Sequence, residues 1–278
     1  MRRLWQLIRV GFTGLSFLGF WIGGALLVLF AFPLARLRHR GAGPVEQAAA
    51  CQRWVQRAFT ALHDFMRITG LLSFQPRTAD ARTPGPRFVL IANHPTLVDV
   101  AALTAVYGRV TCAAKPALFR TPVVGQILRA CGYLDGGNGG AFAGAALVNQ
   151  AVDCLVGGDM PVLVFPEGTR SPMDGLHPFK RGAFEIACRA DVPVLPVFIR
   201  CEPPALGKGR PWYDIPSSTA YFTVTPLAEM NPRDFDRDAS RMAAQCEALY
   251  RRQLGLSPAE STPAPVAPAR PARQNVGT

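Results

Sequence analysis

The sequence predicts an α/β fold, a sheet with helices on both faces, joined to an apolar N-terminal segment. Two observations predict the sheet and its cover: continuous apolar runs of strand length occur through the middle of the chain, and longer helical stretches separate them. A third observation is that residues 10–35 contain no charged side chain. The chain has 278 residues and is 49% hydrophobic, which is enough to bury the core of one domain of ordinary size.

The uncharged run at residues 10–35 predicts a membrane helix. About 20 apolar residues cross the hydrocarbon core of a bilayer, so the run is long enough, and it is too long for the core of a signal peptide. Pro33 and the glycines of the run leave open a bent helix that enters only one leaflet, and a buried helix of a soluble core is the less favoured interpretation. Arginines on both sides leave the orientation open. These are Arg2, Arg3, Arg9, Arg36, Arg38 and Arg40.

Residues 45–69 predict an amphipathic helix. Apolar side chains recur there at intervals of three and four, and polar side chains fill the other side. The apolar face either packs on the domain or lies on the membrane beside the first helix, and the pattern does not choose between them. The Pro/Gly-rich stretch RTPGP at residues 82–86 then opens the globular part.

The globular part is predicted from its alternation of strands and helices. We expect strands at residues 88–92, 110–114, 161–165, 194–199 and 221–224. We expect helices near residues 95–107, 116–130, 141–156 and 181–190, followed by a last amphipathic helix at 239–254. Pro193 and Pro196 favour an edge strand or an irregular segment at that point, because proline cannot donate a backbone hydrogen bond to a sheet.

This organisation divides the chain into four parts. Residues 1–40 form the N-terminal membrane helix, and residues 41–81 form the amphipathic helix and its connector. Residues 82–256 form the α/β domain. The tail at 257–278 is rich in Pro and Ala with few large apolar residues, so we expect it to be disordered.

Charge and cysteine usage narrow the class of partner. The formal net charge of +11 comes mostly from arginine, since Lys115, Lys180 and Lys208 are the only lysines. A basic surface suits nucleic acid, anionic lipid or an acidic small substrate, but no zinc-finger spacing or helix-turn-helix pattern supports nucleic acid. Seven cysteines without a CxxC pair indicate a reduced compartment rather than a disulfide framework or a metal site.

The stretch NHPTLVD at residues 93–99 predicts a paired histidine and carboxylate. We expect the strand to end at Asn93 and a helix to begin at Pro95. His94 then lies just outside the helix, and Asp99 in its second turn can reach back to the ring. A carboxylate on one imidazole nitrogen fixes the tautomer, and the other nitrogen can take a proton from a hydroxyl. The helix N-terminus beside it would offer amide donors to developing negative charge.

Taken alone, this spacing equally suits a capping or core histidine, but a second polar cluster accompanies it. Residues 165–171 read FPEGTRS where another strand ends, and Arg170 offers a planar fork suited to phosphate. Glu167 could hold a hydroxyl or steady the arginine, and an ion pair within the loop is the alternative. Ligands bind beyond the carboxyl ends of strands in open α/β folds, so the two clusters should face one site.

These motifs resemble the glycerolipid acyltransferases of the PlsC type, also called lysophospholipid acyltransferases. The likeness covers residues 88–199, including NHPTLVD, KPALFR from Lys115, FPEGTRS, and VPVLPV at 192–197. It implies a mixed sheet flanked by helices. It also implies transfer of a fatty acyl group from acyl-CoA or acyl carrier protein to a hydroxyl of a lysophospholipid acceptor, without metal or cofactor. The implied location is the inner membrane, with the domain on the cytoplasmic side.

The resemblance also implies roles for individual residues. His94 would be the general base, and Asp99 the residue that orients it. Glu167 and Arg170 would bind the acceptor. The full set of candidate substrate-binding residues is Asn93, Lys115, Glu167, Gly168, Thr169, Arg170 and Lys180.

One departure concerns the second block, which in the family reads Gly-x-x-x-Ile-Asp-Arg and binds the acceptor phosphate through its arginine. Here GYLDGGNGG at 132–140 retains Asp135 but has Gly136 in place of the arginine. An acceptor without a phosphomonoester, such as an amino-acid, glyco- or polyketide-type lipid, is therefore the alternative. A non-catalytic lipid-binding protein is less favoured, and a hydrolase is remote because no G-x-S-x-G motif occurs. Candidates to replace the missing charge are Lys115, Arg120 and Lys180.

Overall fold

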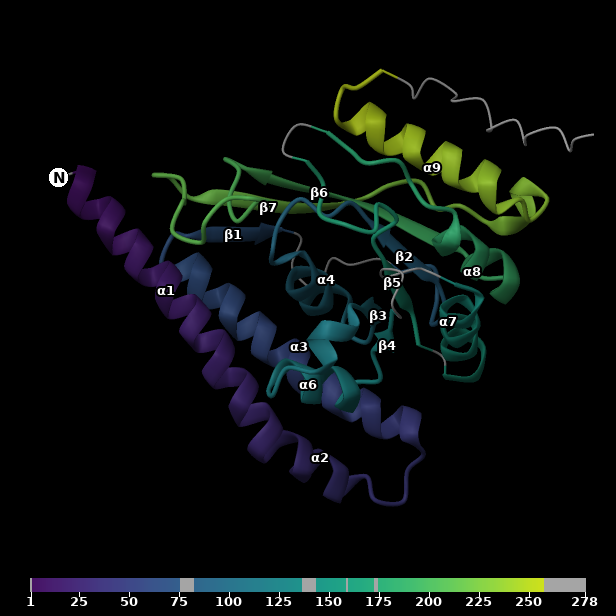
Figure 1. Ribbon diagram of the computed structural model, residues 1–278, viewed down its shortest axis with the longest axis horizontal. Coiled ribbons are helices and arrows are strands. Elements are labelled where there is room, and N and C mark those ends of the chain that lie inside the picture. Colours follow the sequence, from purple (N-terminus) through teal and green to yellow (C-terminus); the bar gives the residue numbers. More distant parts are fainter. Residues whose placement is uncertain (1, 76–82, 137–143, 159, 173–174, 258–278) are drawn as a thin grey trace, which may run out of the picture.

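A mixed sheet with helices on both faces forms the body of the protein, as predicted (Figure 1). The computed structural model describes residues 2–75, 83–136, 144–158, 160–172 and 175–257. Within these residues the sheet has seven strands in the order β1-β7-β6-β2-β5-β3-β4. The predicted tail beyond residue 257 and the predicted helix start at residue 141 lie outside the described residues.

The strands run in two directions. Their bounds are β1 Leu72–Gln75, β2 Val89–Ala92, β3 Thr111–Ala114, β4 Leu134–Asp135, β5 Val162–Val164, β6 Val194–Glu202 and β7 Ala220–Pro226. Strands β6, β2, β5, β3 and β4 are parallel, whereas β7 is antiparallel to β6, and β1 is parallel to β7. The carboxyl ends of the parallel strands therefore meet at one edge. The sequence did not predict β1 and β4, because neither makes a continuous apolar run.

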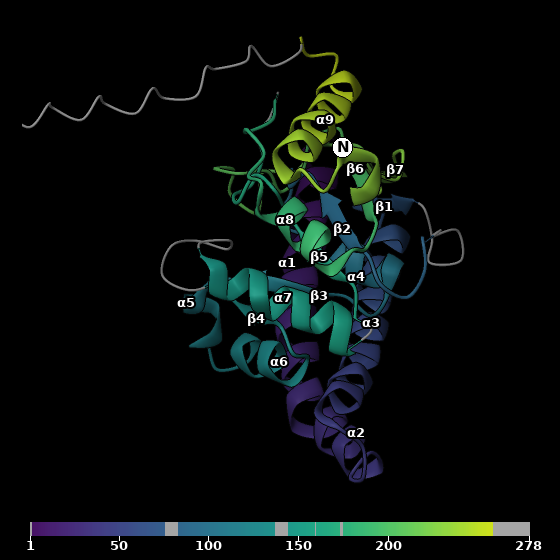
Figure 2. The same cartoon turned by 90° about the vertical axis from the view of Figure 1, so that its right-hand side faces the viewer.

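The helices form two layers around the sheet. Their bounds are α1 Arg2–Leu26, α2 Phe32–Arg38, α3 Pro44–Ile68, α4 Asp99–Tyr107, α5 Pro116–Phe119, α6 Val124–Ala130, α7 Ala145–Gly158, α8 Gly182–Ala190 and α9 Ala239–Gln253. A π-helical turn, η1 (Leu27–Ala31), joins α1 to α2, and a short 3-10 helix, η3 (Pro232–Phe235), precedes α9. Helices α7, α8 and α9 cover one face, and α3 and α4 cover the other, with α1 outside α3 (Figures 1 and 2).

Alternate residues of the central strand β2 face opposite layers. Val89 and Ile91 belong to the core beneath α7, α8 and α9. Leu90 and Ala92 belong to the core beneath α3 and α4. All four side chains are buried, which is why the strand reads as an unbroken apolar run.

The turn before α4 departs from the prediction. We expected a helix from Pro95, but α4 begins four residues later. Thr96 forms an antiparallel β-bridge with Gly207, and the amide of Leu97 donates to the carbonyl of Leu206. This pairing with the loop after β6 holds the chain out of a helix and overrides the preference of proline for a first helical turn.

The helix predicted at residues 116–130 is divided into α5 and α6. Pro122 lies between them; it lacks an N–H and disfavours helical backbone at Thr121, so the helix is interrupted. The chain then returns closely on itself at Gly125. A Cβ at that position would lie 2.2 Å from the carbonyl oxygen of Phe119, so only glycine fits there.

The prediction of an edge strand around Pro196 is wrong, because β6 lies inside the sheet between β7 and β2. The carbonyl of Pro196 accepts from the amide of Leu227 at 2.8 Å, on the side of β7. The nitrogen of Pro196, which carries no hydrogen, points to the same side. The last pair of the ladder with β7 is Val197 with Pro226, so the ladder has already ended at Pro196. The strand therefore loses no ladder hydrogen bond to the proline.

Helix α1 is fastened to the domain near its start. Arg9 is 1% exposed, and its guanidinium donates to the carbonyls of Gly70, Pro216 and Ser218. Gln6 donates to the carbonyl of Ile215 at 2.8 Å. The N-terminal part of the helix is thus tied to the loops that flank β1 and β7.

The contacts of the N-terminal helices continue along their length. Phe20 stacks on Phe59 of α3 with ring centroids 6.4 Å apart, and Gly24 lies against Val123. Phe32 packs with α3 in a third core. Residues Arg3–Arg38 are long and apolar enough to cross a membrane by length and composition. Their outer face exposes Leu4, Trp5, Leu7, Ile8, Leu15, Leu18, Trp21, Ile22, Leu26, Leu29, Phe30, Leu34 and Leu37.

Helix α3 occupies the position between α1 and the sheet. Its buried residues include Cys51, Val55 and Met66. Cys51 and Val55 pack with the end of the N-terminal helices, while Met66 belongs to the core beneath β2. Of the two alternatives left open by the sequence, packing on the domain is the one that the structure contains.

Helix α9 is fixed to the centre of the sheet by Tyr250. The side chain is fully buried, and its hydroxyl lies 2.8 Å from the carbonyl oxygens of Ile91 and Val197. The single hydroxyl proton can be donated to either carbonyl. Tyr250 therefore joins α9 to β2 near its carboxyl end and to the neighbouring part of β6.

Tyr250→Phe should lower the free energy of unfolding by about 1–2 kcal/mol, because two buried carbonyls lose their shared donor while packing is retained. Denaturant unfolding in detergent, followed by tryptophan fluorescence, measures the loss. Tyr221→Phe is the matched control, since Tyr221 is 56% exposed. Equal stability of the two variants would contradict this role for the Tyr250 hydroxyl.

Candidate active site

Two neighbouring strands bring the predicted motifs together. Strands β2 and β5 pair in parallel, so the residues that follow them lie at the same edge of the sheet. The amide of Ser171 donates to the carbonyl of His94 at 2.8 Å, and the amide of His94 donates to the hydroxyl of Ser171 at 3.0 Å. The NHPTLVD turn and the FPEGTRS loop are thus joined directly through their backbones.

His94 and Asp99 form a close pair. The Nδ1 atom of His94 lies 2.6 Å from Oδ2 of Asp99, which also accepts from the amide of Thr96 at 2.8 Å. The Thr96 hydroxyl donates to the other carboxylate oxygen. Asp99 is wholly buried, whereas the His94 side chain is 20% exposed. The ring therefore presents Nε2 as the nitrogen left for a reacting group.

Burial and hydrogen bonding act in opposite directions on Asp99. Loss of solvent raises the pKa of its carboxyl group, while the contacts with His94 and Thr96 work to lower it. Phe165 holds the other side of the ring in place, stacked on His94 with centroids 4.2 Å apart.

The side chain of Glu167 points into the fold and supports the NHPTLVD turn rather than facing solvent. It is 3% exposed, and one carboxylate oxygen accepts from the amide of His94 and the hydroxyl of Ser171. The other oxygen accepts from the amide of His177 at 2.9 Å. Burial raises the pKa of Glu167, and these donors oppose that shift. Among the described residues, no ion pair joins Glu167 to Arg170, and a role of this carboxylate in acceptor binding stays a prediction.

Asn93, another predicted substrate-binding residue, is also turned inward. Its side chain is 4% exposed and lies between β2 and β6. The amide group donates to the carbonyl of Ile199 at 2.8 Å, and its oxygen accepts from the Ile199 amide at 2.7 Å. Asn93 thus extends the pairing of the two strands, and we place it as a support for His94.

The amides of the turn at residues 94–98 are already used within the fold, while the expected donation from the N-terminus of α4, which begins at Asp99, stays a prediction. The amide of His94 serves Glu167 and Ser171, and residue 95 is proline. The amide of Thr96 serves Asp99 and that of Leu97 the loop after β6. The next amide, at residue 98, donates to the Thr96 hydroxyl. The turn orients the imidazole but leaves none of these amides for an oxyanion.

Three cations gather around the FPEGTRS loop. Gly168 has a φ of +69°, and a Cβ there would lie 2.7 Å from Nζ of Lys180, so the lysine covers the glycine closely. Nζ of Lys208 donates to the hydroxyl of Thr169 at 3.2 Å. Arg170 is partly exposed next to them. Within the described part of the chain, none of these three cations forms an ion pair with a carboxylate.

Lys208 is the residue of this group that the sequence analysis missed. It lies on the loop after β6, beyond every motif, and its only signal was rarity, as one of three lysines. Lys115 is exposed at the end of β3, and Gly136 follows β4, where its amide donates to the carbonyl of Ala114. The strand order puts both on the far side of β5 from His94. Gly137, Gly139 and Gly140 lie outside the described residues.

Comparison with known proteins agrees with this arrangement. The family model described as "Acyltransferase" matches residues 73–200, which include both motifs. The 1-acyl-sn-glycerol-3-phosphate acyltransferase of Salmonella typhimurium is 28% identical over 197 residues, 69% of this chain and 78% of that protein. The enzyme of the same name from Escherichia coli is 26% identical over the same shares.

The human 1-acyl-sn-glycerol-3-phosphate acyltransferase alpha is 30% identical over 115 residues, 41% of each chain. In structure, the 1-acyl-sn-glycerophosphate (LPA) acyltransferase PlsC from Thermotoga maritima matches with a TM-score of 0.67. At 19% identity the likeness concerns the fold, and it covers 92% of this chain and 97% of that one. Together these matches support a relationship of the chain to the PlsC-type acyltransferases. Lys208 lies outside the residues that the acyltransferase model matches.

Glu167→Gln should destabilise this acyltransferase by about 1–3 kcal/mol, because the side-chain NH₂ group would face an amide or hydroxyl donor. The displaced turn should also slow acyl transfer. Thermal unfolding and the acyl-transfer rate are measured together. Glu229→Gln is the control, since Glu229 is exposed and its side chain forms no hydrogen bond or ion pair with another described residue. Wild-type stability and rate in Glu167→Gln would show that the carboxylate does not hold the turn.

Proposed function

We propose that the protein transfers a fatty acyl group from acyl-CoA or acyl carrier protein to a hydroxyl of a 1-acyl-glycerol-3-phosphate-like acceptor. The observation that supports it most is the His94–Asp99 pair, held at the carboxyl end of β2 beside cations that have no carboxylate partner among the described residues. The names of the bacterial and human relatives support an acceptor of this kind. Neither a metal nor a cofactor has a step in this proposal.

In the proposed mechanism His94 acts as a general base. Nε2 takes the proton from the acceptor hydroxyl while that oxygen attacks the thioester carbonyl. The tetrahedral intermediate then collapses, the carbon–sulfur bond breaks, and the thiolate takes the proton back from the imidazolium. The products are the acylated lipid and the free thiol, so no acyl-enzyme forms. Asp99 stabilises the imidazolium and keeps the proton on Nδ1.

His94→Ala should reduce turnover by roughly 10²–10⁴-fold, because the acceptor hydroxyl loses its base. Asp99→Asn should lower kcat steeply with little change in the acceptor KM, since it disturbs the imidazole rather than the binding groups. Steady-state rates with lysophosphatidate and acyl-CoA measure both effects, and circular dichroism checks the fold. Full activity of His94→Ala would overturn the mechanism, whereas absence of turnover in the wild-type protein would favour a lipid-binding role without catalysis.

Gly136 favours a second class of acceptor. Gly136 has no side chain where the family's second block carries its phosphate-binding arginine. An amino-acid, glyco- or polyketide-type lipid without a phosphomonoester is therefore the competing acceptor. A panel of such lipids assayed beside lysophosphatidate separates the two, and a clear preference for lysophosphatidate removes the alternative.

We propose further that the N-terminal helices embed in one leaflet of the inner membrane, with the domain on its cytoplasmic side. The domain contacts α1 from Arg9 to Gly24 and packs on Phe32 beyond it, so that side of the helix does not face lipid. The outer face is apolar and suits the acyl region of a leaflet. Seven free cysteines in the chain suit a reduced compartment.

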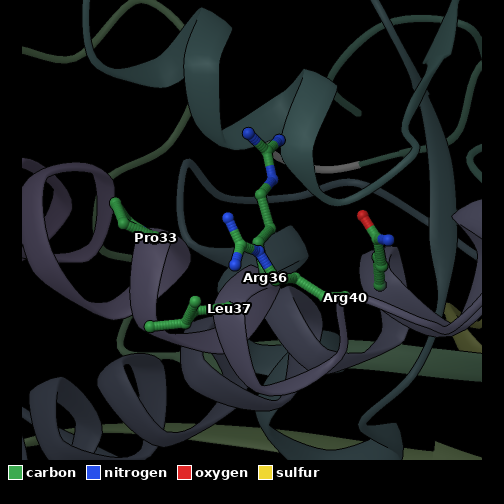
Figure 3. Close-up of a pocket in the computed structure, with 5 residues that line it drawn as sticks. Pro33, Arg36, Leu37 and Arg40 are labelled. Carbon is green, nitrogen blue, oxygen red and sulfur yellow. The ribbon is translucent and has the colours of Figure 1, made fainter.

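A cationic hollow lies at the C-terminal end of this helix pair. It has a volume of about 320 Å³ and is lined by Pro33, Arg36, Leu37, Arg40 and Gln47. Figure 3 shows Arg36 and Arg40 directed into the same space, beside apolar side chains. Among the described residues, neither arginine forms an ion pair with a carboxylate. A mixed cationic and apolar lining suits the glycerophosphate region of an anionic lipid.

Arg36→Gln/Arg40→Gln should weaken binding to phosphatidylcholine vesicles that contain phosphatidylglycerol. Each arginine near an anionic surface contributes about 1 kcal/mol, so the pair should cost roughly 30-fold in affinity. Vesicle sedimentation measures this, with pure phosphatidylcholine vesicles as the neutral reference. Arg189→Gln/Arg252→Gln makes the same change of charge on α8 and α9. Equal losses in the two double variants would mean that net charge, not this hollow, governs binding.

A further inference from the structure

The loop after β6 approaches both segments of the candidate active site. Its residues Leu206 and Gly207 pair with the turn that carries His94. The next residue, Lys208, reaches across to the other segment, where its Nζ donates to the Thr169 hydroxyl at 3.2 Å. Lys208 therefore lies where the NHPTLVD turn and the FPEGTRS loop meet.

The same loop reaches the membrane-facing helix within four residues of Lys208. Trp212 packs over Gly14 of α1 and makes an edge-to-face contact with Phe17, with ring centroids 6.0 Å apart. Trp212 and its neighbour Tyr213 are 46% and 56% exposed. Aromatic side chains with a polar edge favour the boundary between lipid and water. The loop thus places Lys208 between the imidazole and the proposed membrane surface.

The loop has a defined shape on this path. Arg210 forms an ion pair with Asp214 at 3.0 Å, and Gly209 has a φ of +80°, a conformation that glycine adopts without strain. Beyond it, Gln6 and Arg9 of α1 hold the carbonyls of Ile215 and Pro216. Contacts at both ends therefore fix the position from which the Lys208 side chain extends.

The positive charge around Lys208 favours the binding of an anion. Thr169 offers it a neutral hydroxyl, and the adjacent cations, Lys180 and Arg170, add positive charge. In the part of the chain that the structure describes, no carboxylate pairs with any of the three. The three positive charges repel one another, and an anion bound between them would offset that repulsion. Phosphate oxygens accept strong charge-assisted hydrogen bonds from lysine and arginine.

We propose that Lys208 binds the phosphate headgroup of the lipid acceptor and supplies charge that Gly136 does not. This inference rests on the proposed acyl transfer to a lysophosphatidate-like acceptor. The acceptor is favoured over the phosphates of the donor because the loop joins the acceptor's base, His94, to the helix that faces lipid. Lys208 thereby selects acceptors with an anionic headgroup.

The test compares Lys208→Gln and Lys208→Arg in the full-length protein in mixed micelles. The KM values for lysophosphatidate and for acyl-CoA are measured separately, and uncharged monoacylglycerol serves as a second acceptor. Lys208→Gln should raise the KM for lysophosphatidate roughly tenfold, with little change in the KM for acyl-CoA or in turnover of monoacylglycerol. Lys208→Arg should restore most of the affinity, because it retains the charge.

Arg109→Gln is the control for loss of one positive charge, since Arg109 is exposed and precedes β3 at the opposite edge of the sheet. Thermal unfolding confirms that the Lys208 variants fold. An unchanged lysophosphatidate KM, a rise only in the acyl-CoA KM, or equal losses with both acceptors would overturn the assignment while leaving the proposed function intact. Absence of wild-type turnover with any lysophospholipid would instead sink the proposed function and this assignment together.

Discussion

The carboxylate of Asp99 sets the conditions for the rest of the site, because a charge without solvent must be surrounded by donors. His94 and Thr96, in the turn before α4, supply those donors. This turn therefore does not adopt helical backbone, and α4 begins only at Asp99. Its shape is held from one side by the loop after β6 and from the other by Glu167. Much of the polar network at this edge of the sheet therefore serves one buried negative charge and the ring beside it.

The sequence predicted the elements that depend on local pattern. The apolar runs became strands, and the motifs after β2 and β5 met because adjacent parallel strands end at the same edge. Local sequence pattern did not predict which individual polar side chains would be buried. Asn93 and Glu167 looked like groups for a substrate, yet their hydrogen bonds turn inward to Ile199 and to the backbone of the turn.

Other features could not be predicted because they depend on contacts far apart in the chain. Pro196 favoured an edge, but its missing N–H faces a place where the neighbouring strand has already ended. The helix start at Pro95 was overridden by pairing with residues more than a hundred positions away. Lys208 reaches the site on the same distant loop and carries no recognisable motif. Tertiary pairing, rather than local propensity, decided all three.

The buried guanidinium of Arg9 has a consequence for the membrane placement proposed above. Three carbonyls of the domain depend on it, and the underside of α3 depends on the cover of the helices that follow. These contacts join the N-terminal helices to the domain from Arg9 to Phe32. In the membrane placement proposed above, these contacts would fix the height of the imidazole over the lipid surface, so a substrate would have to rise to it. Removal of the N-terminal helices would expose an apolar surface of the domain and leave these backbone carbonyls without their donor. Simple truncation is therefore a poor route to a soluble form.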